Sequence, residues 1–510
     1  MIRKYPIGIQ SFSEIRKGGY LYVDKTAYIH RLVETGKFYF LSRPRRFGKS
    51  LLVDTMSELF SGNKELFEGL WIEHHWDWRQ TSPVIRFHLA QLPYEQGNLI
   101  EALKAGIQKN AHRLGIQLSA DNIKELFVEL IEKASQKGKV VILIDECDKP
   151  IIDYVNNPKI MEENRLIMKR FYSILKDCDK LIRLLFLTGV SQFSQISIFS
   201  DLNNLRNITL VSQFGGLTGI TQSELEHYFA PEIQERKNIE PDILNLIKRW
   251  YDGYTWNLKD WVYNPYSLLN YFADPELTFT NFWFQTGTPT YLISHLSRHR
   301  IHDLEEIKIG ANDLNYFDPE NTPIGSILFQ TGYLTLKQRS VSGQVYTLGF
   351  PNIEVKSSFL DNLLAIYRGT YPSSSMPTIE TIQDALYVKD IDRLIQELNA
   401  LIASIPFDHW QGDKASIFNI IIYLTFRLSG IDVETEIHSA KGRCDLLIQT
   451  SHYVYVIELK LDGSAIEAIE QIISKEYLAK FSTDQRRKVA IGINCSSQEK
   501  KITDYIVRAL

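Results

Sequence analysis

The sequence predicts an α/β protein with an N-terminal parallel sheet, a helical region and a second, smaller α/β domain at its C-terminal end. Three short apolar runs, at 38–41, 140–144 and 184–187, end in polar residues, as the buried strands of a parallel sheet do. A Pro/Ser-rich segment at 371–377 has the composition of a linker. Helix and strand patterns resume after it.

The first run is followed by a basic turn at 43–50 and by an apolar pattern typical of a helix. A helical stretch at 121–136 leads into the second run, which ends in Asp145 and Glu146, and the third run ends in Thr188. Carboxyl ends of parallel strands meet at one edge of a sheet, where ligands bind. We therefore expect these polar residues to lie together.

Beyond the sheet, Thr221 and Glu224 have the spacing of a capping box and predict a helical lid. Aromatic residues at 250–254 and 263–267 fit turns of that lid, and core packing explains them equally well.

Two alternating runs at 332–337 and 344–348 predict a hairpin in a small winged-helix-like module. The C-terminal pattern predicts helices at 379–403, 415–429 and 464–480, and strands at 432–437, 443–449, 453–459 and, as the last one, 487–493.

A length of 510 residues exceeds one ordinary core, and we expect three domains, at 1–275, 276–372 and 379–510. The formal net charge of −4 excludes a uniformly basic protein, so nucleic-acid contact requires a local groove.

The four cysteines lack CxxC spacing, which argues against a zinc site or a disulfide framework and fits a reducing cytoplasm. The first residues lack the apolar segment of a signal peptide, and the longest apolar runs, such as 417–426, are too short to span a bilayer. We expect a cytoplasmic protein without membrane contact.

The most informative motif is the turn after the first strand, which reads Arg43-Pro44-Arg45-Arg46-Phe47-Gly48-Lys49-Ser50 and continues into Leu51. A phosphate-binding loop needs inward N–H groups, a helix N-terminus, a lysine for the β- and γ-phosphates and a hydroxyl for Mg²⁺. The last three residues of the motif supply this chemistry. An arginine replaces the usual first glycine. Taken alone, the motif also fits a basic turn that carries Gly-Lys-Ser by chance.

The strand-end residues favour the phosphate loop. Asp145 is placed to hold the Mg²⁺ shell, Glu146 to polarise the water that attacks the γ-phosphate, and Thr188 to hydrogen-bond that phosphate or water. Together with the loop they predict a site for ATP and Mg²⁺.

Four arginines are candidate phosphate or sensor groups, although a solvated surface position explains an individual arginine as well: Arg43, Arg45, Arg46 and Arg206. For Arg43 we expect contact with phosphate at the position where a glycine only turns the chain.

Residues 6–270 resemble the AAA-ATPase-like family of prokaryotic proteins, which are P-loop NTPases related to the STAND and archaeal ATPase groups. The resemblance rests on the stretches PIGI at 6–9, YVDKT at 22–26, RPRRFGKS at 43–50, LIDECDKP at 143–150, LTGVSQFSQISIFSDLNNL at 187–205 and YNP at 263–265. The family carries arginine at the first Walker A position, which explains Arg43, and it usually has tyrosine at the position of Cys147. The resemblance implies a three-layer P-loop fold and ATP hydrolysis.

A second constellation lies in the C-terminal strands. Asp445 lies in one predicted strand, and Glu458 and Lys460, two residues apart, share one face of the next. Two carboxylates can hold Mg²⁺ at a phosphodiester while the ammonium group stabilises the attacking hydroxide or the transition state. Gln471 and Lys475 are one turn apart on the following helix and are candidate nucleic-acid contacts.

Residues 405–495 resemble the PD-(D/E)xK nuclease superfamily, which implies a restriction-endonuclease-like fold. The matching residues are Glu436, Gly442, Arg443, Asp445, Glu458, Lys460, Gln471, Lys475 and Tyr477. The family usually places a glutamate near the start of the helix at 415–429, where this chain has Lys-Ala-Ser and only Asp413 nearby. This departure puts cleavage in doubt.

These patterns lead us to expect an ATP-dependent or ATP-gated, Mg²⁺-dependent nuclease that acts on DNA. The family context associates such proteins with defence against foreign DNA or with mobile elements. The alternative is a nucleotide-switched, STAND-like scaffold whose C-terminal domain binds without cutting. Whether the protein forms a homo-oligomer is left open by the sequence.

Overall fold

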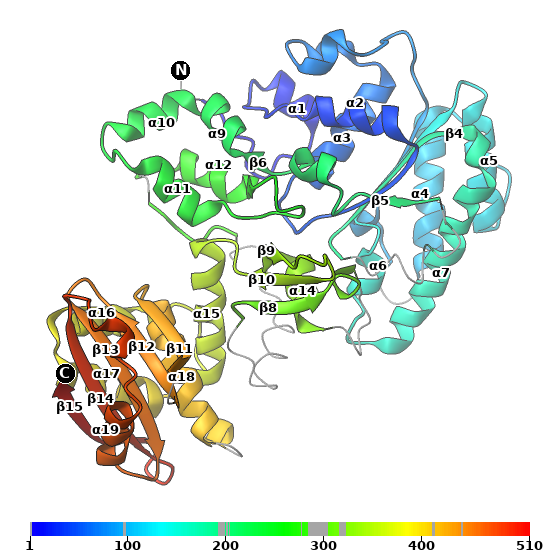
Figure 1. Ribbon diagram of the computed structural model, residues 1–510. Coiled ribbons are helices and arrows are strands. Elements are labelled where there is room, and N and C mark those ends of the chain that lie inside the picture. Colours follow the sequence, from blue (N-terminus) through cyan, green and yellow to red (C-terminus); the bar gives the residue numbers. More distant parts are fainter. Residues whose placement is uncertain are drawn as a thin grey trace. The chain divides into compact units, whose positions relative to one another are not determined.

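The computed structural model describes residues 3–94, 98–191, 199, 202, 204–276, 278–283, 304–315, 323–410, 414–439 and 442–510. The chain divides into two compact units (Figure 1). The first comprises Met1–Gln285 and Glu305–Val355, and the second comprises Thr286–Leu304 and Lys356–Leu510. The three predicted domain ranges stay predictions.

The first unit contains a five-stranded parallel sheet in the order β2-β3-β4-β1-β5. Its strands are β1 (Phe38–Ser42), β2 (Val84–His88), β3 (Val140–Asp145), β4 (Ile182–Gly189) and β5 (Arg206–Asn207). The three apolar runs form β1, β3 and β4, which confirms the predicted α/β class. We did not predict β2, because two polar residues interrupt its apolar pattern.

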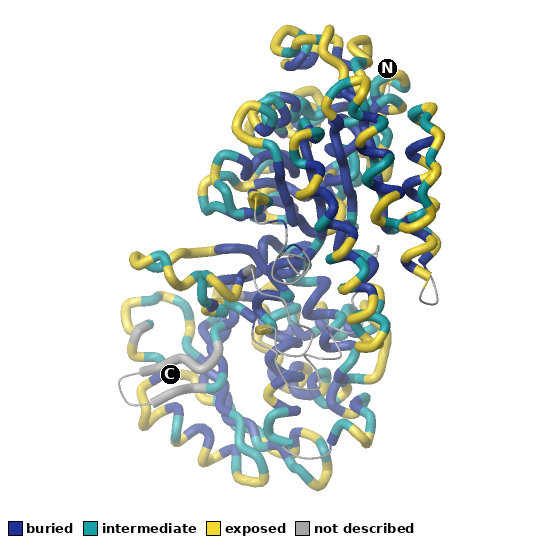
Figure 2. Tube along the Cα trace, turned by 90° about the vertical axis from the view of Figure 1, so that its right-hand side faces the viewer, coloured by how far each residue is buried: buried dark blue, intermediate teal, exposed yellow. Residues whose placement is uncertain are grey.

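Helices cover both faces of this sheet and complete a three-layer arrangement (Figure 1). One face packs against α4 (Leu99–Leu114), α5 (Ile123–Ser135) and α7 (Pro158–Asp177), and the other against α1 (Phe12–Lys17), α2 (Thr26–Thr35) and α3 (Lys49–Ser61). The strands are buried on both sides, as Figure 2 shows, which explains their continuous apolar runs.

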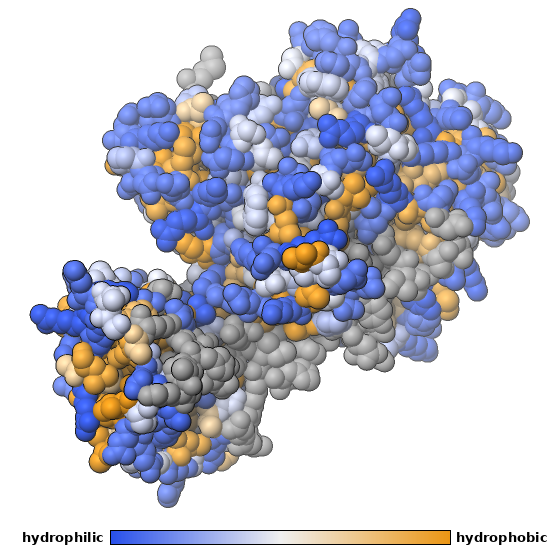
Figure 3. All heavy atoms as spheres, viewed as in Figure 1, coloured by the Kyte–Doolittle hydropathy of each residue, from blue (hydrophilic) through white to orange (hydrophobic). Residues whose placement is uncertain are grey.

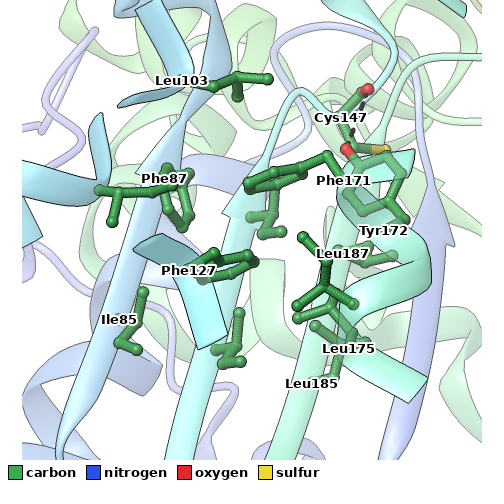
Figure 4. Packing of buried hydrophobic residues seen from close by; sticks show 14 of the residues in the cluster. Ile85, Phe87, Leu103, Phe127, Cys147, Phe171, Tyr172, Leu175, Leu185 and Leu187 are labelled. Carbon is green, nitrogen blue, oxygen red and sulfur yellow. Dashed lines mark hydrogen bonds between the residues drawn. The ribbon is translucent and has the colours of Figure 1, made fainter. Parts of the chain in front are cut away.

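Aromatic packing fills the layer between the sheet and helices α4, α5 and α7 (Figure 4). Phe127 and Phe171 stack with ring centroids 4.7 Å apart, and the edge of Phe87 on β2 meets Phe171 at 5.6 Å. Each such buried ring contributes about 2 kcal/mol through the area it removes from water. This core holds the strand ends in register.

A helical lid follows the sheet and has its own core. It contains α9 (Gln222–Tyr228), α10 (Ala230–Lys237), α11 (Ile243–Tyr251) and α12 (Pro265–Ala273), with a small ladder between β6 (Ile220–Thr221) and β7 (Val262–Tyr263). Thr221 and Glu224 form the predicted capping box at the start of α9. Asn264 caps α12 through its side-chain oxygen, which accepts the N–H groups of Tyr266 and Ser267.

The rest of the first unit combines one helix with a three-stranded antiparallel sheet in the order β8-β10-β9. It contains β8 (Ile307–Gly310), α14 (Ile324–Thr331), β9 (Thr335–Arg339) and β10 (Val345–Gly349), and α15 (Ile353–Arg368) follows. The pairing of β9 with β10 confirms the predicted hairpin.

The second unit carries a five-stranded sheet in the order β11-β12-β13-β14-β15. The pairs are antiparallel except β13 with β14, which are parallel and joined by α19. The elements are α16 (Met376–Val388), α17 (Ile391–Ala403), α18 (Lys414–Leu428), β11 (Asp432–Ser439), β12 (Gly442–Gln449), β13 (Tyr453–Leu461), α19 (Ala465–Ser474), β14 (Arg487–Ser496) and β15 (Lys501–Ala509).

Three sequence-based details of the second unit were wrong. The stretch at 379–403 is two helices, because Lys389 takes a left-handed φ of 62° and Asp390 caps the next helix. The helix predicted to reach 480 ends at Ser474. The strand at 487–493 is not the last, because β15 follows it as an edge strand in which Ile502 is the one fully buried residue.

Short elements complete the described structure. One is the helix α6 (Lys149–Ile152), and the 3₁₀ helices span Lys64–Phe67, Trp71–His74, Leu89–Gln91, Asp179–Leu181, Ser212–Leu217, Asp313–Asn315, Phe407–Trp410 and Ala479–Phe481. Within the described residues, no helix is long and apolar enough to cross a membrane. Hydrophilic side chains cover most of the face seen in Figure 3, with apolar residues scattered among them.

Candidate functional site

The loop at 43–48 joins β1 to α3 at the carboxyl edge of the first sheet. Gly48, the N-cap of α3, has a φ of 82°, and Arg46 has a φ of 68°. Left-handed conformations at these two positions turn the chain tightly into the helix. The first N–H groups of α3 have no partner within the helix, so this turn presents donors to an anion.

Lys49 is buried inside the loop and holds its shape. Its Nζ donates to the carbonyl oxygens of Arg43 at 2.8 Å and Pro44 at 2.9 Å. Burial lowers the pKa of Lys49, and the nearby carboxylates of Asp145 and Asp148 oppose this shift. The ammonium group therefore lies between the loop and the acidic strand ends, where a phosphate oxygen would be a stronger partner than a carbonyl.

The structure corrects the expectation that the Arg43 side chain contacts phosphate. Its guanidinium is fully buried and donates to the carbonyl oxygens of Ser42 at 2.8 Å and Thr209 at 3.0 Å. The same group lies 4.0 Å from the ring centroid of Trp256. Arg43 thus ties the end of β1 to two other segments, which a glycine would not do.

The loop also packs against the segment that follows α11. Phe47 is buried, and its ring meets Tyr254 at 4.8 Å and Trp256 at 5.4 Å between centroids. Pro44 lies so close to Gly332 that a Cβ added to that glycine would be 2.6 Å from the proline Cβ. These contacts show why the residues between the first arginine and Gly48 are apolar or large here, unlike those of a glycine-rich loop.

The remaining loop positions face outward to different degrees. Arg45 and Arg46 are exposed, and the guanidinium of Arg46 lies 4.6 Å from the ring centroid of Tyr266 in α12. Ser50 and Leu51 in the first turn of α3 are half-buried. Arg206 is exposed on the edge strand β5, so the geometry gives no support for a phosphate role there.

Three neighbouring strand ends bring the predicted acidic residues together. Asp145 ends β3 and is fully buried. Its Oδ1 accepts the hydroxyl of Thr188 on β4 at 2.5 Å and the N–H of Glu146 at 3.1 Å. Since β4 lies between β3 and β1, Thr188 stands between the acidic strand and the phosphate loop.

Glu146 follows Asp145 in a left-handed conformation with a φ of 54°. Burial and the neighbouring Asp145 raise its pKa. A carboxylate whose protonated form is favoured in this way is a better proton acceptor for a nearby water than an ordinary surface glutamate.

Two residues beside this edge were missed in the sequence, the buried Asp148 and the half-buried His88. Asp148 accepts the N–H groups of Val190 at 2.9 Å and Ser191 at 2.7 Å, and so holds the chain just after β4. His88 ends β2, and its Nε2 lies 3.6 Å from Asp145 Oδ2. The group of acidic residues at 145–148 could have indicated Asp148 in the sequence. His88 ends β2, a strand that was not predicted, so no sequence pattern indicated this histidine.

The donor set fits Mg²⁺ in the nucleotide site. Asp145 Oδ2 is buried without a hydrogen-bond partner, and Ser50 carries a hydroxyl at the start of α3. Among the described side chains, no group of three or more His, Cys, Asp or Glu forms a metal cluster. Mg²⁺ usually takes one or two protein ligands and completes its shell with phosphate oxygens and water, and Asp145 and Ser50 could supply two such ligands.

The second site lies where β12, β13 and α19 meet in the second unit. Leu446 pairs with Ile457 in the antiparallel ladder, which places Asp445 beside Glu458 at the next step. Asp445 Oδ2 accepts the N–H of Leu459 at 2.8 Å. The sheet thus positions both carboxyl groups.

Lys460 and Gln471 complete this cluster. Lys460 Nζ donates to Glu458 Oε1 at 3.2 Å and to Gln471 Oε1 at 2.5 Å. The Gln471 amide donates to the same Glu458 oxygen and, at 3.2 Å, to the hydroxyl of Tyr477. The structure therefore unites Asp445, Glu458, Lys460 and Gln471 in one hydrogen-bonded group.

Glu458 has the features of a metal ligand. Its side chain is buried, and Oε2 has no hydrogen-bond partner. Burial and the neighbouring Asp445 raise its pKa to about 7. A cation between the two carboxylates would satisfy the buried oxygen and favour the ionised form.

Other predicted residues are not brought into this group. Lys475 is the exposed C-cap of α19. The side chains of Glu436 and Arg443 and the whole of Asp413 lie outside the described residues, while Gly442 begins β12. The sequence of α18 contains no acidic residue, so α18 does not supply the missing glutamate.

The pKa of Glu458 predicts how metal binding depends on pH. Below about pH 7 the carboxyl group binds a proton that the metal must displace, so affinity for Mn²⁺ should fall about tenfold per pH unit and level off above pH 8. Calorimetric titration at pH 6 in two buffers of different ionisation enthalpy should show nearly one proton released per Mn²⁺. The same titration with Glu458→Gln is the control. An affinity that is unchanged between pH 6 and pH 8 would contradict this prediction.

Comparison with known proteins shows which families the two parts of the chain belong to. Residues 6–199 match the family described as predicted AAA-ATPase, and residues 416–505 match the PD-(D/E)XK nuclease superfamily. The chain is an AAA-ATPase-like protein with a C-terminal PD-(D/E)XK nuclease superfamily domain. Both resemblances seen in the sequence are thereby confirmed.

A relative of this AAA-ATPase-like protein spans its full length. The uncharacterized protein in the vnfD 5′ region of Azotobacter chroococcum mcd 1 is 36% identical over 526 residues, which cover 100% of this chain and 99% of that protein. The alignment with this relative therefore includes both matched regions of the chain. No solved structure matches the chain.

Proposed function

We propose that this protein is an ATP-regulated, Mg²⁺-dependent nuclease that acts on DNA. The observation that carries the proposal is the cluster of Asp445, Glu458, Lys460 and Gln471, in which a buried carboxylate oxygen of Glu458 has no partner beside a second acid and a lysine. Such a set suits hydrolysis of a phosphodiester.

In the nuclease site each residue has a distinct task. Asp445 and Glu458 would hold Mg²⁺, which polarises the phosphodiester and lowers the pKa of its water. Lys460 stabilises the negative charge that develops during attack, and Gln471 fixes Lys460 and Glu458 in place through its amide. Lys475 on the exposed end of α19 is a candidate contact for the nucleic-acid backbone.

In the nucleotide site, the first turn of α3 and Lys49 bind the phosphates, and Ser50 and Asp145 would hold Mg²⁺ with the β- and γ-phosphate oxygens. Thr188 orients Asp145, and Glu146 accepts a proton from the attacking water. ATP binding or hydrolysis is the signal that controls the nuclease domain. The protein acts in the cytoplasm, and its family context links it to defence against foreign DNA or to mobile elements.

One observation favours a second function, a nucleotide-switched scaffold of the STAND type whose C-terminal domain binds a nucleic acid or protein without cutting. In the family the glutamate on the helix before β11 often completes the metal site, and α18 carries none. A site with two carboxylates holds a metal less firmly than a site with three.

Incubation of the protein with supercoiled plasmid separates the two functions. The reactions contain Mg²⁺ or Mn²⁺ with ATP, with a non-hydrolysable ATP analogue or with no nucleotide, and a single-stranded RNA of similar length runs in parallel. We expect nicking of the plasmid that requires the metal and changes in rate with ATP. Retention of the plasmid in a mobility-shift assay without nicking in any nucleotide state would favour the scaffold, and cleavage of RNA alone would overturn the assignment of DNA.

A further inference from the structure

His88 stands at the same edge of the first sheet as the acidic residues of the nucleotide site. In the parallel ladder between β2 and β3, the Cα partner of His88 is Asp145. Side chains along a strand alternate between faces, and Val84, Val141, Leu143, Leu184 and Phe186 pack on the face covered by α3. His88, Asp145 and Thr188 follow these residues by even steps, so all three lie on the α3 face.

A second line of geometry brings α3 to the same place. Arg86 on β2 forms an ion pair with Asp54 on α3, which fixes the helix against this strand. Ser50 lies four residues before Asp54, about 6 Å toward the start of the helix. His88 lies two residues beyond Arg86, about 6.6 Å toward the end of the strand. Because the helix starts at the carboxyl edge, both steps lead toward that edge, which places Ser50 at the same end of the sheet as His88 and Asp145.

Two polar atoms at this edge of the sheet, one on Asp145 and one on His88, have no hydrogen-bond partner. Asp145 is fully buried, its Oδ1 is occupied by Thr188 and Glu146, and its Oδ2 has no hydrogen-bond partner. Nε2 of His88 lies 3.6 Å from that oxygen, just beyond hydrogen-bonding distance, and its buried Nδ1 has no partner either. Buried polar atoms without a partner destabilise a protein, so these two atoms indicate a site that is completed on binding.

We propose that His88 is a positioning residue of the nucleotide site, which fixes the Asp145 carboxylate for the Mg²⁺ that accompanies ATP. Its Nε2–H donates to Asp145 Oδ2 when the site is filled, so the carboxylate is held by Thr188 on one oxygen and by His88 on the other. His88 would thus act through Asp145, the residue that would hold the metal, and not on the metal itself. This inference rests on the proposed ATP site.

Loss of a residue that positions Asp145 should change the affinity for the metal more than the affinity for the nucleotide. Partners that orient a metal-bound carboxylate typically change metal affinity or activity by 10- to 100-fold. The phosphates themselves are bound by Lys49 and by α3, which His88 does not replace. We therefore expect His88→Leu to bind ATP in EDTA within about twofold of wild type, and to require 10- to 100-fold more Mg²⁺ for the metal-dependent change in binding.

The test is a fluorescence titration of the full-length chain with a fluorescent, non-hydrolysable ATP analogue, first in EDTA and then with increasing Mg²⁺. His88→Gln keeps an N–H donor of similar reach and should restore part of the Mg²⁺ response. His112→Leu, on an exposed position of α4, is the matched control and should behave as wild type. Thermal unfolding of each variant without ligand shows whether a loss is one of folding.

The outcomes separate this inference from the function on which it rests. A His88→Leu protein with the wild-type Mg²⁺ response would overturn the role of His88 and leave the ATP site standing. A protein that melts at a lower temperature but responds to Mg²⁺ as wild type does would show that His88 only packs. A wild-type protein that binds no nucleotide would overturn the proposed function, and the role of His88 with it.

Discussion

Replacing Lys49 with alanine is expected to weaken ATP binding by about 100-fold or more, because charge-assisted hydrogen bonds contribute about 1.5–3 kcal/mol each and Lys49 supplies two of them. In the structure, both bonds go to carbonyl oxygens of the loop, and the ammonium is buried among the acids at the strand ends. In the ATP complex the β- and γ-phosphate oxygens take over as its partners. Alanine leaves those oxygens facing a space without a donor.

The measurement is equilibrium binding of ATP with Mg²⁺ by calorimetry, using Lys109→Ala on the exposed side of α4 as the matched control. Loss of Lys49 also removes the donor that the Arg43 and Pro44 carbonyls share. Thermal unfolding without nucleotide therefore has to show that the variant is folded before its binding is compared. ATP binding by folded Lys49→Ala at wild-type affinity would remove the phosphate loop from the proposed function.

The positions of polar residues in the sequence were sufficient to predict which side chains lie at the carboxyl edge of the first sheet. Buried parallel strands are continuous apolar runs, so the first polar residue after each run marks the edge where ligands bind. Asp145 and Thr188 were placed in this way, and the structure joins them by a hydrogen bond. The glycine and lysine of the loop follow from the same rule, because a strand must turn sharply to start a helix at that edge.

Arg43 and His88 show where this reasoning stops. A basic residue in a phosphate loop is expected to bind phosphate. The Arg43 guanidinium instead donates hydrogen bonds to buried carbonyl oxygens and lies over the ring of Trp256. Two of these partners, Thr209 and Trp256, lie about 170 and 210 residues away in the chain, so no local sequence pattern indicates them. His88 was missed because Arg86 breaks the apolar run of β2, and the ion-pair partner of this half-buried arginine belongs to another element, α3.

The nuclease site was predicted through alternation, since residues two apart on a strand share one face. This predicted that Glu458 and Lys460 share a face, and their side chains are in contact. Gln471 was predicted only as a contact for nucleic acid, and the structure places its amide on Lys460 and Glu458. The spacing of apolar residues could not show that Lys475 is the C-cap of α19. The end of this helix depends on the turn after Ser474 and not on the periodic pattern of apolar residues. The edge strand β15 was not predicted, because its side chains are mostly exposed or half-buried and its sequence therefore has no clear apolar pattern.

Replacing Lys460 with alanine is expected to reduce plasmid nicking by at least about 100-fold while metal binding remains, because the ammonium acts on the charge that develops in the reaction. Lys460 also lowers the pKa of Glu458, so its loss raises that pKa further and weakens metal binding near neutral pH. Wild type and variant are therefore compared at pH 8.5, where Glu458 is ionised in both.

Two measurements on the same preparations distinguish Lys460 from the metal ligands. Mn²⁺ titration by calorimetry should give similar affinities for wild type and Lys460→Ala but little binding for Glu458→Ala. Both variants should nick the plasmid far more slowly than wild type. Lys501→Ala, an exposed lysine at the start of β15, is the matched control and should cut as wild type does. Nicking by Lys460→Ala at the wild-type rate would show that a different site or a contaminating nuclease cuts the plasmid. If Lys460→Ala and wild type bind Mn²⁺ equally and neither cuts, the buried carboxylates hold a metal for binding nucleic acid, and the scaffold function follows.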